Sequence, residues 1–239
     1  MEITFLNKFC EAGNLKSLLE VHHLPASMEP FVGQLRSYFD PIPLTATTND
    51  RSREDALDDQ LFKDLILKIN EKFPIKNKAW VSSNHYSAMK GNRSNFVPIT
   101  SRATFLKSHT KIEEIYSPFH VNENNCTVSF KNGSKTSHGR IESIFEHSRT
   151  GPDNEVSRDV FFAIKPLAPI NTPVACDPFI QLSDYEMQVA LLRFHPKVDM
   201  RIFHESEILF HCAWIEFKAG ELSKEIQFET IAAVVLDRS

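Results

Sequence analysis

The chain has 239 residues, 41% of them hydrophobic, and a formal net charge of −4. This length and apolar content suffice for one large or two small domains with a hydrophobic core, which excludes a chain that is disordered throughout. Because the net charge is negative, general attraction to a polyanion is excluded, and any contact with nucleic acid would need a local basic patch.

The spacing of the cysteines and the first residues of the chain indicate the cellular compartment. The four cysteines lie far apart in the sequence and form no C-x-x-C pair, which favours reduced intracellular thiols over a disulfide framework or a zinc ribbon. The opening MEITFLNKFCEAGN has an acidic Glu2 where a signal peptide has basic residues, and no apolar run is long enough to span a bilayer. We therefore expect an intracellular protein, in the nucleus or the cytoplasm, with no membrane partner.

Helical spacing of apolar residues dominates the first third of the chain. It predicts helices within residues 3–20 and 31–39, and a longer helix whose apolar stripe runs from Leu57 to Ile69. Ser52 and Asp55 resemble a capping box that would start this third helix, and Pro74 would end it. Residues 1–75 are thus predicted to form a helical N-terminal region.

Residues 76–110 form a predicted basic connector, because Lys, Arg and aromatic residues occur there without any Asp or Glu. The basic side chains could contact phosphates, and the aromatic rings could stack on unpaired bases. The alternative is a solvated linker whose aromatic residues pack on a neighbouring domain. The candidate nucleic-acid-binding residues are Lys76, Lys78, Lys90, Arg93, Arg102 and Lys107.

From residue 111 onward the sequence has the alternation of β-strands. The segment CTVSF at 126–130 and the segment GRIESIFEH at 139–147 are separated by Asn132-Gly133, which supplies positive φ for a tight hairpin turn. The alternation predicts Ile141, Ser143 and Phe145 on one face of the second strand. After a polar connection, VFFAI at 160–164 forms a third strand, apolar enough to be central in a sheet.

Further strands are predicted in MRIFHESEILFHCAWIEF and EIQFETIAAVVL, near the end of the chain. Residues 111–239 are therefore expected to form one β-rich module. The predicted fold class is α+β, in which a helical N-terminal segment precedes a bent antiparallel β-sheet or a small barrel.

Several motifs of the second half carry a family resemblance. They are IYSP at 115–118, GRIESIFEH at 139–147, VFFAIKP at 160–166, DPF at 177–179 and PKVDMRIFHESEILFHCAW at 196–214. Their order resembles the β-rich C-terminal portion of fungal transposon-encoded proteins, the Kyakuja-Dileera-Zisupton-like and CACTA-like transposase relatives, and it looks like a bromo-adjacent homology (BAH) domain. The metal-binding carboxylates of a transposase nuclease have no counterpart here. The resemblance thus implies a transposon-derived module that does not cut DNA.

The resemblance also implies partners, because BAH-like domains can bind histone tails or other chromatin proteins. A methylated lysine would need two or three aromatic faces around its cation. The candidate pocket residues, which lie beside strand ends and loops, are Tyr116, Phe119, Tyr185 and Trp214. The alternative is that these aromatic side chains pack in the core.

The segment 195–212 carries the one local cluster of residue types that ligate metals or act as nucleophiles, namely His195, His204, His211 and Cys212. On one continuous strand His204 and His211 would face opposite sides, so we expect no shared metal and no cofactor. Three functions remain open. The first is a non-catalytic module that binds chromatin protein, histone peptide or nucleic acid in the nucleus, and the second is an enzyme of unrecognised type that uses this cluster. The third is a pathogen-derived or mobile-element product that self-associates through an exposed sheet edge. Convergence of these side chains on a cleft would favour the enzyme.

Overall fold

The computed structural model describes residues 53–91, 93–112, 114–170, 177–180, 189–195 and 197–236. The chain divides into two compact units, residues 1–51 and residues 52–239. The helices predicted within 3–20 and 31–39 belong to the first unit and lie outside the described residues. The expected boundaries after residues 75 and 110 both fall inside the second unit.

The second unit consists mainly of strands. In chain order its described elements, with η marking 3-10 turns, are β1 (Arg53–Ala56), α3 (Asp59–Lys72), β2 (Ala79–Ser82), α4 (Ser83–Ala88), β3 (Phe96–Ile99), β4 (Arg102–Leu106), β5 (His109–Lys111), β6 (Glu114–Tyr116), η2 (Glu123–Asn125), β7 (Thr127–Asn132), β8 (Lys135–Thr150), β9 (Val156–Pro166), β10 (Ala168–Pro169), β11 (Val189–Arg193), β12 (Arg201–His204), η5 (Glu205–Glu207), β13 (Ile208–Phe217) and β14 (Thr230–Val235). None of the helices among these elements is long and apolar enough to cross a lipid bilayer.

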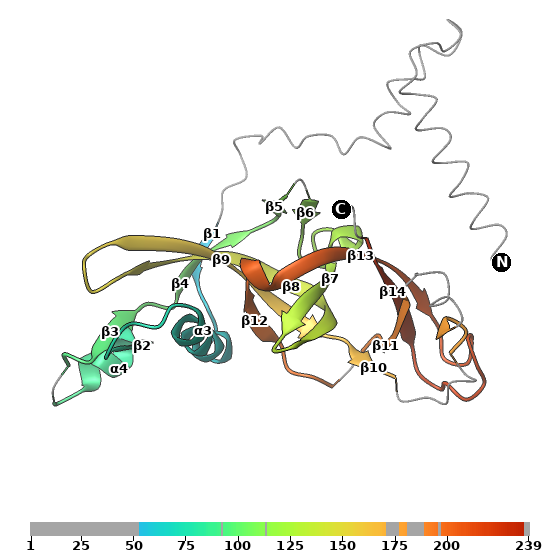
Figure 1. Cartoon of the computed structure of the whole chain (residues 1–239), viewed down its shortest axis with the longest axis horizontal. Helices are drawn as coiled ribbons and strands as arrows, with labels where there is room; N and C mark the ends of the chain where they lie inside the picture. The colour runs from blue at the N-terminus through green and yellow to red at the C-terminus, as the bar shows by residue number, and fades with distance from the viewer. Residues whose placement is uncertain are drawn as a thin grey trace, which may run out of the picture. The chain divides into compact units, whose positions relative to one another are not determined.

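Ten of these strands form one antiparallel sheet, in the order β1-β4-β8-β7-β13-β14-β11-β10, with β9 and β12 continuing it from the other edge of β8 (Figure 1). The 16-residue strand β8 is its centre, because β7 and β4 pair with one edge and β9 with the other. The predicted antiparallel sheet is thereby confirmed. The small barrel is not formed, because the sheet does not close on itself.

The hairpin β7–β8 pairs as predicted. Its strands are in register from Thr127 opposite Arg140 to Asn132 opposite Lys135. The turn is one residue later than expected, since its central residues are Gly133 and the following serine, and Gly133 has a φ of 64°. A left-handed residue at this place in a two-residue hairpin turn favours glycine.

A β-bulge in β8 changes which side chains share a face. The register with β9 shifts between Ile141 and Ser143. Ile141 and Ile144 therefore lie in the same buried cluster, whereas Phe145 lies in the cluster on the opposite face. The prediction that Ile141, Ser143 and Phe145 share one face is wrong, because strict alternation fails where one strand contributes an extra residue.

The long strand β9 is buried on both faces. Phe161 and Phe162 are each 0% exposed. Phe161 packs in the cluster that includes Leu65 and Ile69 of α3, and Phe162 packs with Ile144 on the other side of the sheet. The central position predicted for this strand is confirmed.

Helix α3 covers one face of the sheet through Leu61, Leu65 and Ile69. Its N-cap is Asp58, whose carboxylate accepts the backbone N–H of Leu61 at 2.8 Å. The capping box predicted at Ser52 and Asp55 is wrong, because Arg53–Ala56 is an edge strand paired with β4.

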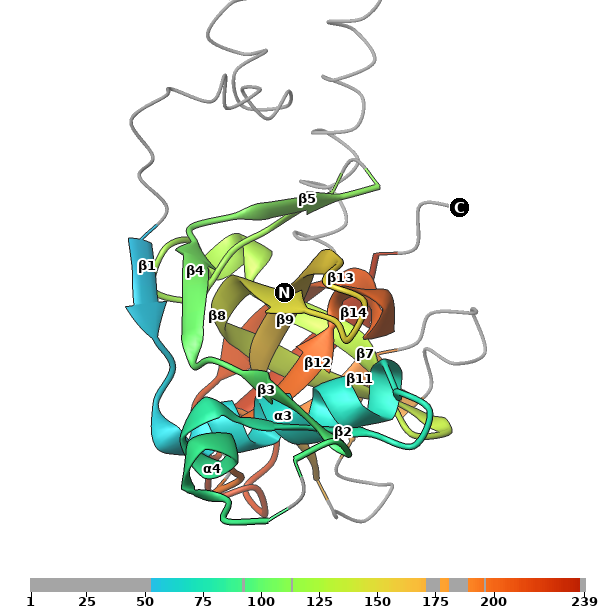
Figure 2. The ribbon, with the colours of Figure 1, turned by 90° about the vertical axis from the view of Figure 1, so that its left-hand side faces the viewer.

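The strands β12, β9, β8, β7 and β13 curl around a common centre, with α3 against the outside (Figure 2). Inside the curl, the rings of Phe130 on β7 and Phe203 on β12 lie 4.3 Å apart. The two strands are not hydrogen-bonded to each other, and the turn η5 carries the chain from β12 directly into β13. The curl therefore keeps an opening between β12 and the β7 side.

Candidate binding groove

The predicted basic connector is folded rather than extended. Residues 76–110 contain β2, α4, β3 and β4, and Trp80 is a core side chain whose indole N–H donates to the Phe73 carbonyl at 2.9 Å. Trp80 therefore packs inside the protein, as the alternative to nucleic-acid binding predicted for aromatic residues of this segment. Its ring is not accessible for stacking on a base.

The six candidate phosphate contacts lie on different elements of the fold. The guanidinium of Arg93 donates to the backbone carbonyl of Met89 at 2.9 Å and lies 5.3 Å from the Tyr86 ring centre. Arg102 lies 3.7 Å from the carboxylate of Glu54 on β1. The other four are Lys76 and Lys78 after α3, Lys90 after α4 and Lys107 at the end of β4, all of them exposed.

The candidate aromatic pocket is not assembled among the described residues. Tyr116 is 1% exposed; it packs against Phe162 and donates its hydroxyl to Glu114 at 2.6 Å. Burial and this hydrogen bond raise the pKa of the Tyr116 hydroxyl. Tyr116 is therefore part of the core, and Tyr185 lies outside the described residues.

Phe119, one of the remaining two candidates, lies against a cation that the protein itself supplies. The guanidinium of Arg140 lies 4.1 Å from the ring centre of Phe119 and 5.8 Å from that of Phe194. Phe194 in turn stacks on Trp214 at 5.9 Å. Arg140 is also paired with Glu142 at 2.8 Å. A ligand cation would have to displace Arg140 from these rings.

The His/Cys cluster does not converge on one cleft. His195 is mostly exposed and lies 3.6 Å from Glu229, whereas the His211 ring packs 4.2 Å from Tyr116. Burial raises the pKa of the Cys212 thiol to about 12, which disfavours the nucleophilic thiolate. The part of the chain that the structure describes holds no group of three potential metal ligands.

His204 belongs to a separate polar chain. One of its ring nitrogens lies 3.3 Å from Asp159 and the other lies 2.8 Å from the Ser206 hydroxyl. The same nitrogen accepts the Ser206 backbone N–H, and Glu207 accepts the His204 backbone N–H in return. These contacts form the capping box of η5 and account for the arrangement without a catalytic role.

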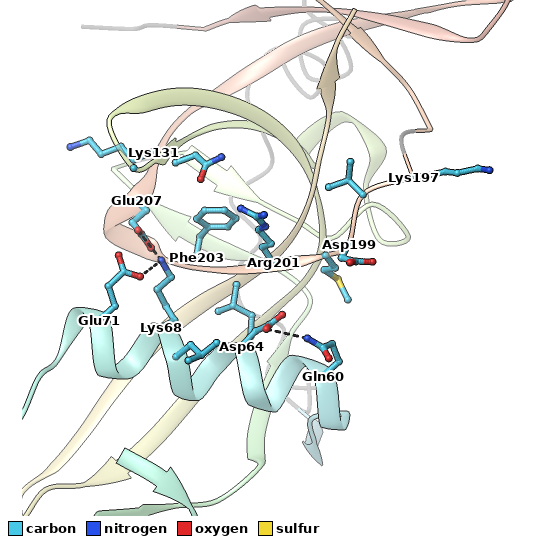
Figure 3. Close-up of a pocket in the computed structure, with 16 residues that line it drawn as sticks. Gln60, Asp64, Lys68, Glu71, Lys131, Lys197, Asp199, Arg201, Phe203 and Glu207 are labelled. Carbon is cyan, nitrogen blue, oxygen red and sulfur yellow. Dashed lines mark hydrogen bonds and ion pairs between the residues drawn. The ribbon is translucent and has the colours of Figure 1, made fainter. Parts of the chain in front are cut away.

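A groove of about 640 Å³ lies at the opening of the curl (Figure 3). Helix α3 forms one wall, the tip of the β7–β8 hairpin forms another, and the segment leading into β12 crosses between them. Its lining residues are Gln60, Asp64, Leu67, Lys68, Glu71, Lys131, Asn132, Gly133, Lys197, Val198, Asp199, Met200, Arg201, Ile202, Phe203 and Glu207.

The floor of the groove is an ion-pair network that ties α3 to η5. Lys68 bonds Glu71 at 2.9 Å and Glu207 at 3.2 Å, and Lys72 reaches the same Glu207 oxygen at 3.2 Å. The hydrogen bond from Lys68 is the main cause that lowers the pKa of Glu71. In Figure 3 Lys68 points up from the helix toward Glu207. These charges pair with one another, although the Glu71 side chain is 64% exposed.

The rim of the groove carries unpaired positive charge. Lys131, Lys197 and Arg201 are exposed and form no ion pair with any residue that the structure describes. The carboxylates left beside them are Asp199 and Asp64, and Asp64 accepts a hydrogen bond from Gln60 at 3.2 Å. The whole lining has four basic and four acidic side chains, and those outside the ion-pair network are three cations and two carboxylates. An anionic group would gain from this rim.

The same groove exposes apolar surface. Leu67 on α3 is 68% exposed and Val198 is 37% exposed. Ligand pockets for drug-sized molecules are mostly apolar, whereas this lining is mainly charged with a few apolar patches. Such a surface suits a chain segment with mixed apolar and acidic side chains better than a small apolar compound.

Sequence reasoning missed the groove. Lys197 and Asp199 lie in a short segment with no helical or strand periodicity, Arg201 lies in a segment predicted only as strand, and Lys131 lies between the two predicted strands of the hairpin. The one available signal was the density of charge in PKVDMR, which a solvated loop explains equally well.

Comparisons with protein-family models, with curated proteins and with solved structures find no match.

Proposed function

We propose that this chain is a non-catalytic binding module that holds an acidic segment of a partner protein in the groove at the opening of the curled sheet. The observation that carries the proposal is the rim of Lys131, Lys197 and Arg201, whose charges have no partner among the described residues. Charge complementarity of this kind chiefly sets specificity and association rate.

The partner class follows from the charges of the groove. A basic histone tail would meet the three rim cations, so the groove favours an acidic protein segment over such a tail. Association with chromatin, location in the nucleus and origin from a transposon-encoded protein are proposals that rest on the family resemblance. Contact with nucleic acid through Lys76, Lys78, Lys90, Arg93, Arg102 and Lys107 likewise stays a prediction.

The test compares two synthetic peptides by nuclear magnetic resonance titration. One is a Ser-rich peptide with a central Glu-Val-Glu, and the other has Lys-Val-Lys at the same place. We expect the acidic peptide to bind and to shift the signals of groove residues. The double variant Arg201→Glu, Lys131→Glu should weaken binding at least tenfold, as two attractive charges become repulsive.

Lys78→Glu is the matched control, because Lys78 is an exposed lysine outside the groove lining. It should leave the affinity within about twofold. Preference for the Lys-Val-Lys peptide, or equal weakening by the control and the groove variant, would contradict the proposed function.

A further inference from the structure

The groove is bordered by a strand with an unused edge. Within the described part of the chain β12 pairs with β9 alone, from Arg201 opposite Ile164 to His204 opposite Phe161. Unpaired strand edges are templates for pairing with another chain, and many proteins bind extended peptides in this way. Residues Arg201, Ile202 and Phe203 of this strand all line the groove.

The direction of the free backbone groups follows from one hydrogen bond. The backbone N–H of His204 donates to the Glu207 carboxylate at 2.9 Å, so it points away from β9. In an antiparallel pair, residues bonded to the neighbour alternate with residues whose N–H and C=O point outward. The N–H and C=O of Ile202, two residues earlier, therefore point away from β9 and into the groove.

We propose that the acidic segment binds as an added antiparallel strand on β12, paired through the backbone of Ile202. This inference rests on the proposed function and specifies how the groove holds its partner. One residue of the segment exchanges two hydrogen bonds with Ile202. The four residues of β12 give a pairing length of about 13 Å at roughly 3.3 Å per residue, so a partner stretch of four or five residues suffices.

The register dictates which side chains fit. Directly opposite residues project to the same face of a sheet. Ile202 packs with the α3 cluster, so the residue opposite it faces the helix wall that carries Leu67 and should be apolar. The next residue of an antiparallel strand lies opposite Arg201 and should be Asp or Glu. The preferred segment is thus an apolar residue followed directly by an acidic one.

Binding by strand addition also requires that the ligand of the groove is a polypeptide and not a nucleic acid. A nucleic-acid strand is anionic and would be attracted by the rim, but it has no backbone N–H spaced to pair with the Ile202 carbonyl. We therefore infer a polypeptide, and duplex or single-stranded DNA should not protect the Ile202 amide from hydrogen exchange.

The test uses the Glu-Val-Glu peptide in three forms: unmodified, N-methylated on Val, and N-methylated on the second Glu. Methylation of Val removes the N–H that donates to Ile202 and should weaken binding roughly fivefold to tenfold. Methylation of Glu, whose N–H points away from β12, should change the affinity less than about twofold. Binding of the unmodified peptide should also slow exchange of the Ile202 amide.

The possible failures are distinguishable. If both methylated peptides bind as well as the parent and the Ile202 amide is unprotected, while Arg201→Glu still weakens binding, strand addition is wrong and the acidic groove stands. If the parent peptide does not bind the full chain, the proposed function fails as well. Protection of the Ile202 amide in the free protein would show that the edge is already covered, by this chain or by a second copy, and would overturn the inference.

Discussion

Strands β9 and β12 are neighbours in the sheet with the same side-chain environment and different backbone environments. Phe161 on β9 and Ile202 on β12 pack under α3, and Phe162 and Phe203 pack inside the curl. Yet β9 is hydrogen-bonded along both edges, whereas β12 is paired along one. Whether the side chains of a strand are buried and whether both of its edges are hydrogen-bonded are therefore separate properties. A strand can contribute side chains to the core and still have an edge on which a partner strand can pair.

The largest expected effect is a loss of stability, and it tests whether β9 and β12 share one side-chain environment. Phe161→Ala and Phe162→Ala should each lower the free energy of unfolding by about 3–5 kcal/mol, because each removes a fully buried ring. Phe203→Ala on β12, which is 4% exposed, should cost about as much. Denaturant titration measures all three.

Val156→Ala serves as the control, because this first residue of β9 is 63% exposed and its truncation should change stability by less than about 0.5 kcal/mol. If Phe203→Ala alone lowers the free energy of unfolding by less than about 1 kcal/mol, the side chains of β12 are peripheral. The statement that β9 and β12 share one side-chain environment would then be wrong.

A smaller effect tests how tightly β8 is enclosed. A Cβ added at Gly139 would come within 2.9 Å of the Phe130 ring and would press on Ile164 of β9. Gly139→Ala should therefore destabilise the protein by about 1–3 kcal/mol through overpacking. Gly91→Ala, where a Cβ would meet open space, should change stability by no more than about 0.5 kcal/mol in the same titration.

The pH dependence of stability tests the burial of His147 on the face of β8 under α3. His147 is 0% exposed; one ring nitrogen lies 2.9 Å from the Thr100 carbonyl, and the other has no hydrogen-bond partner among the described residues. Burial lowers the pKa of His147 and nearby Arg149 acts in the same direction, whereas the hydrogen bond to Thr100 and the charge of Asp159 oppose the shift.

Because the folded pKa of His147 is depressed, the unfolded chain binds the proton first, and stability should fall as the pH drops below about 6.5. His147→Gln keeps a donor for Thr100 and should make this decline shallower in unfolding curves at pH 7 and pH 5.5. Exposed His85→Gln is the control. If the His147 variant shows the same decline, other groups cause it, and half-buried His138, with a pKa also lowered by burial, is the first to examine.

The smallest effect concerns the basic residues outside the groove. Changing Lys76, Lys78, Lys90 and Arg93 to Ser should leave peptide binding at β12 unaltered. If these residues contact nucleic acid, the same change should flatten the salt dependence of that binding by about 0.7–0.9 logarithmic units per lost phosphate contact. Filter binding at two salt concentrations measures the slope, and an unchanged slope would retire this segment as a nucleic-acid site.

The hairpin β7–β8 and the buried strand β9 could be predicted from sequence, because alternation and the turn at Gly133 are local signals. The bulge after Ile141 could not, because the extra residue is defined only by the partner strand. The start of α3 was misplaced because Ser52 and Asp58 both suit an N-cap, and the pairing of β1 decides between them.

The candidate site was harder to predict than the fold. The pattern of side chains indicates which face of a strand is buried, but not which of its edges is paired. The unpaired edge of β12 therefore could not be predicted from its sequence, RIFH. The burial of Tyr116 and Trp80 was equally hard to predict, because both rings place their polar atoms in hydrogen bonds inside the core.

The contacts that complete the curl join distant parts of the chain, and this bears on the order of folding. The Ser129 hydroxyl donates to the Phe210 carbonyl 81 residues later, and the Lys68–Glu207 pair spans 139 residues. The hairpins β7–β8 and β8–β9 can form from local sequence, but these closures must wait for nearly the whole chain and carry a large loop-closure entropy. During synthesis the outer edge of β7 therefore emerges before β13 exists to cover it, and we expect a slow late folding step in which the nascent protein is most prone to aggregate.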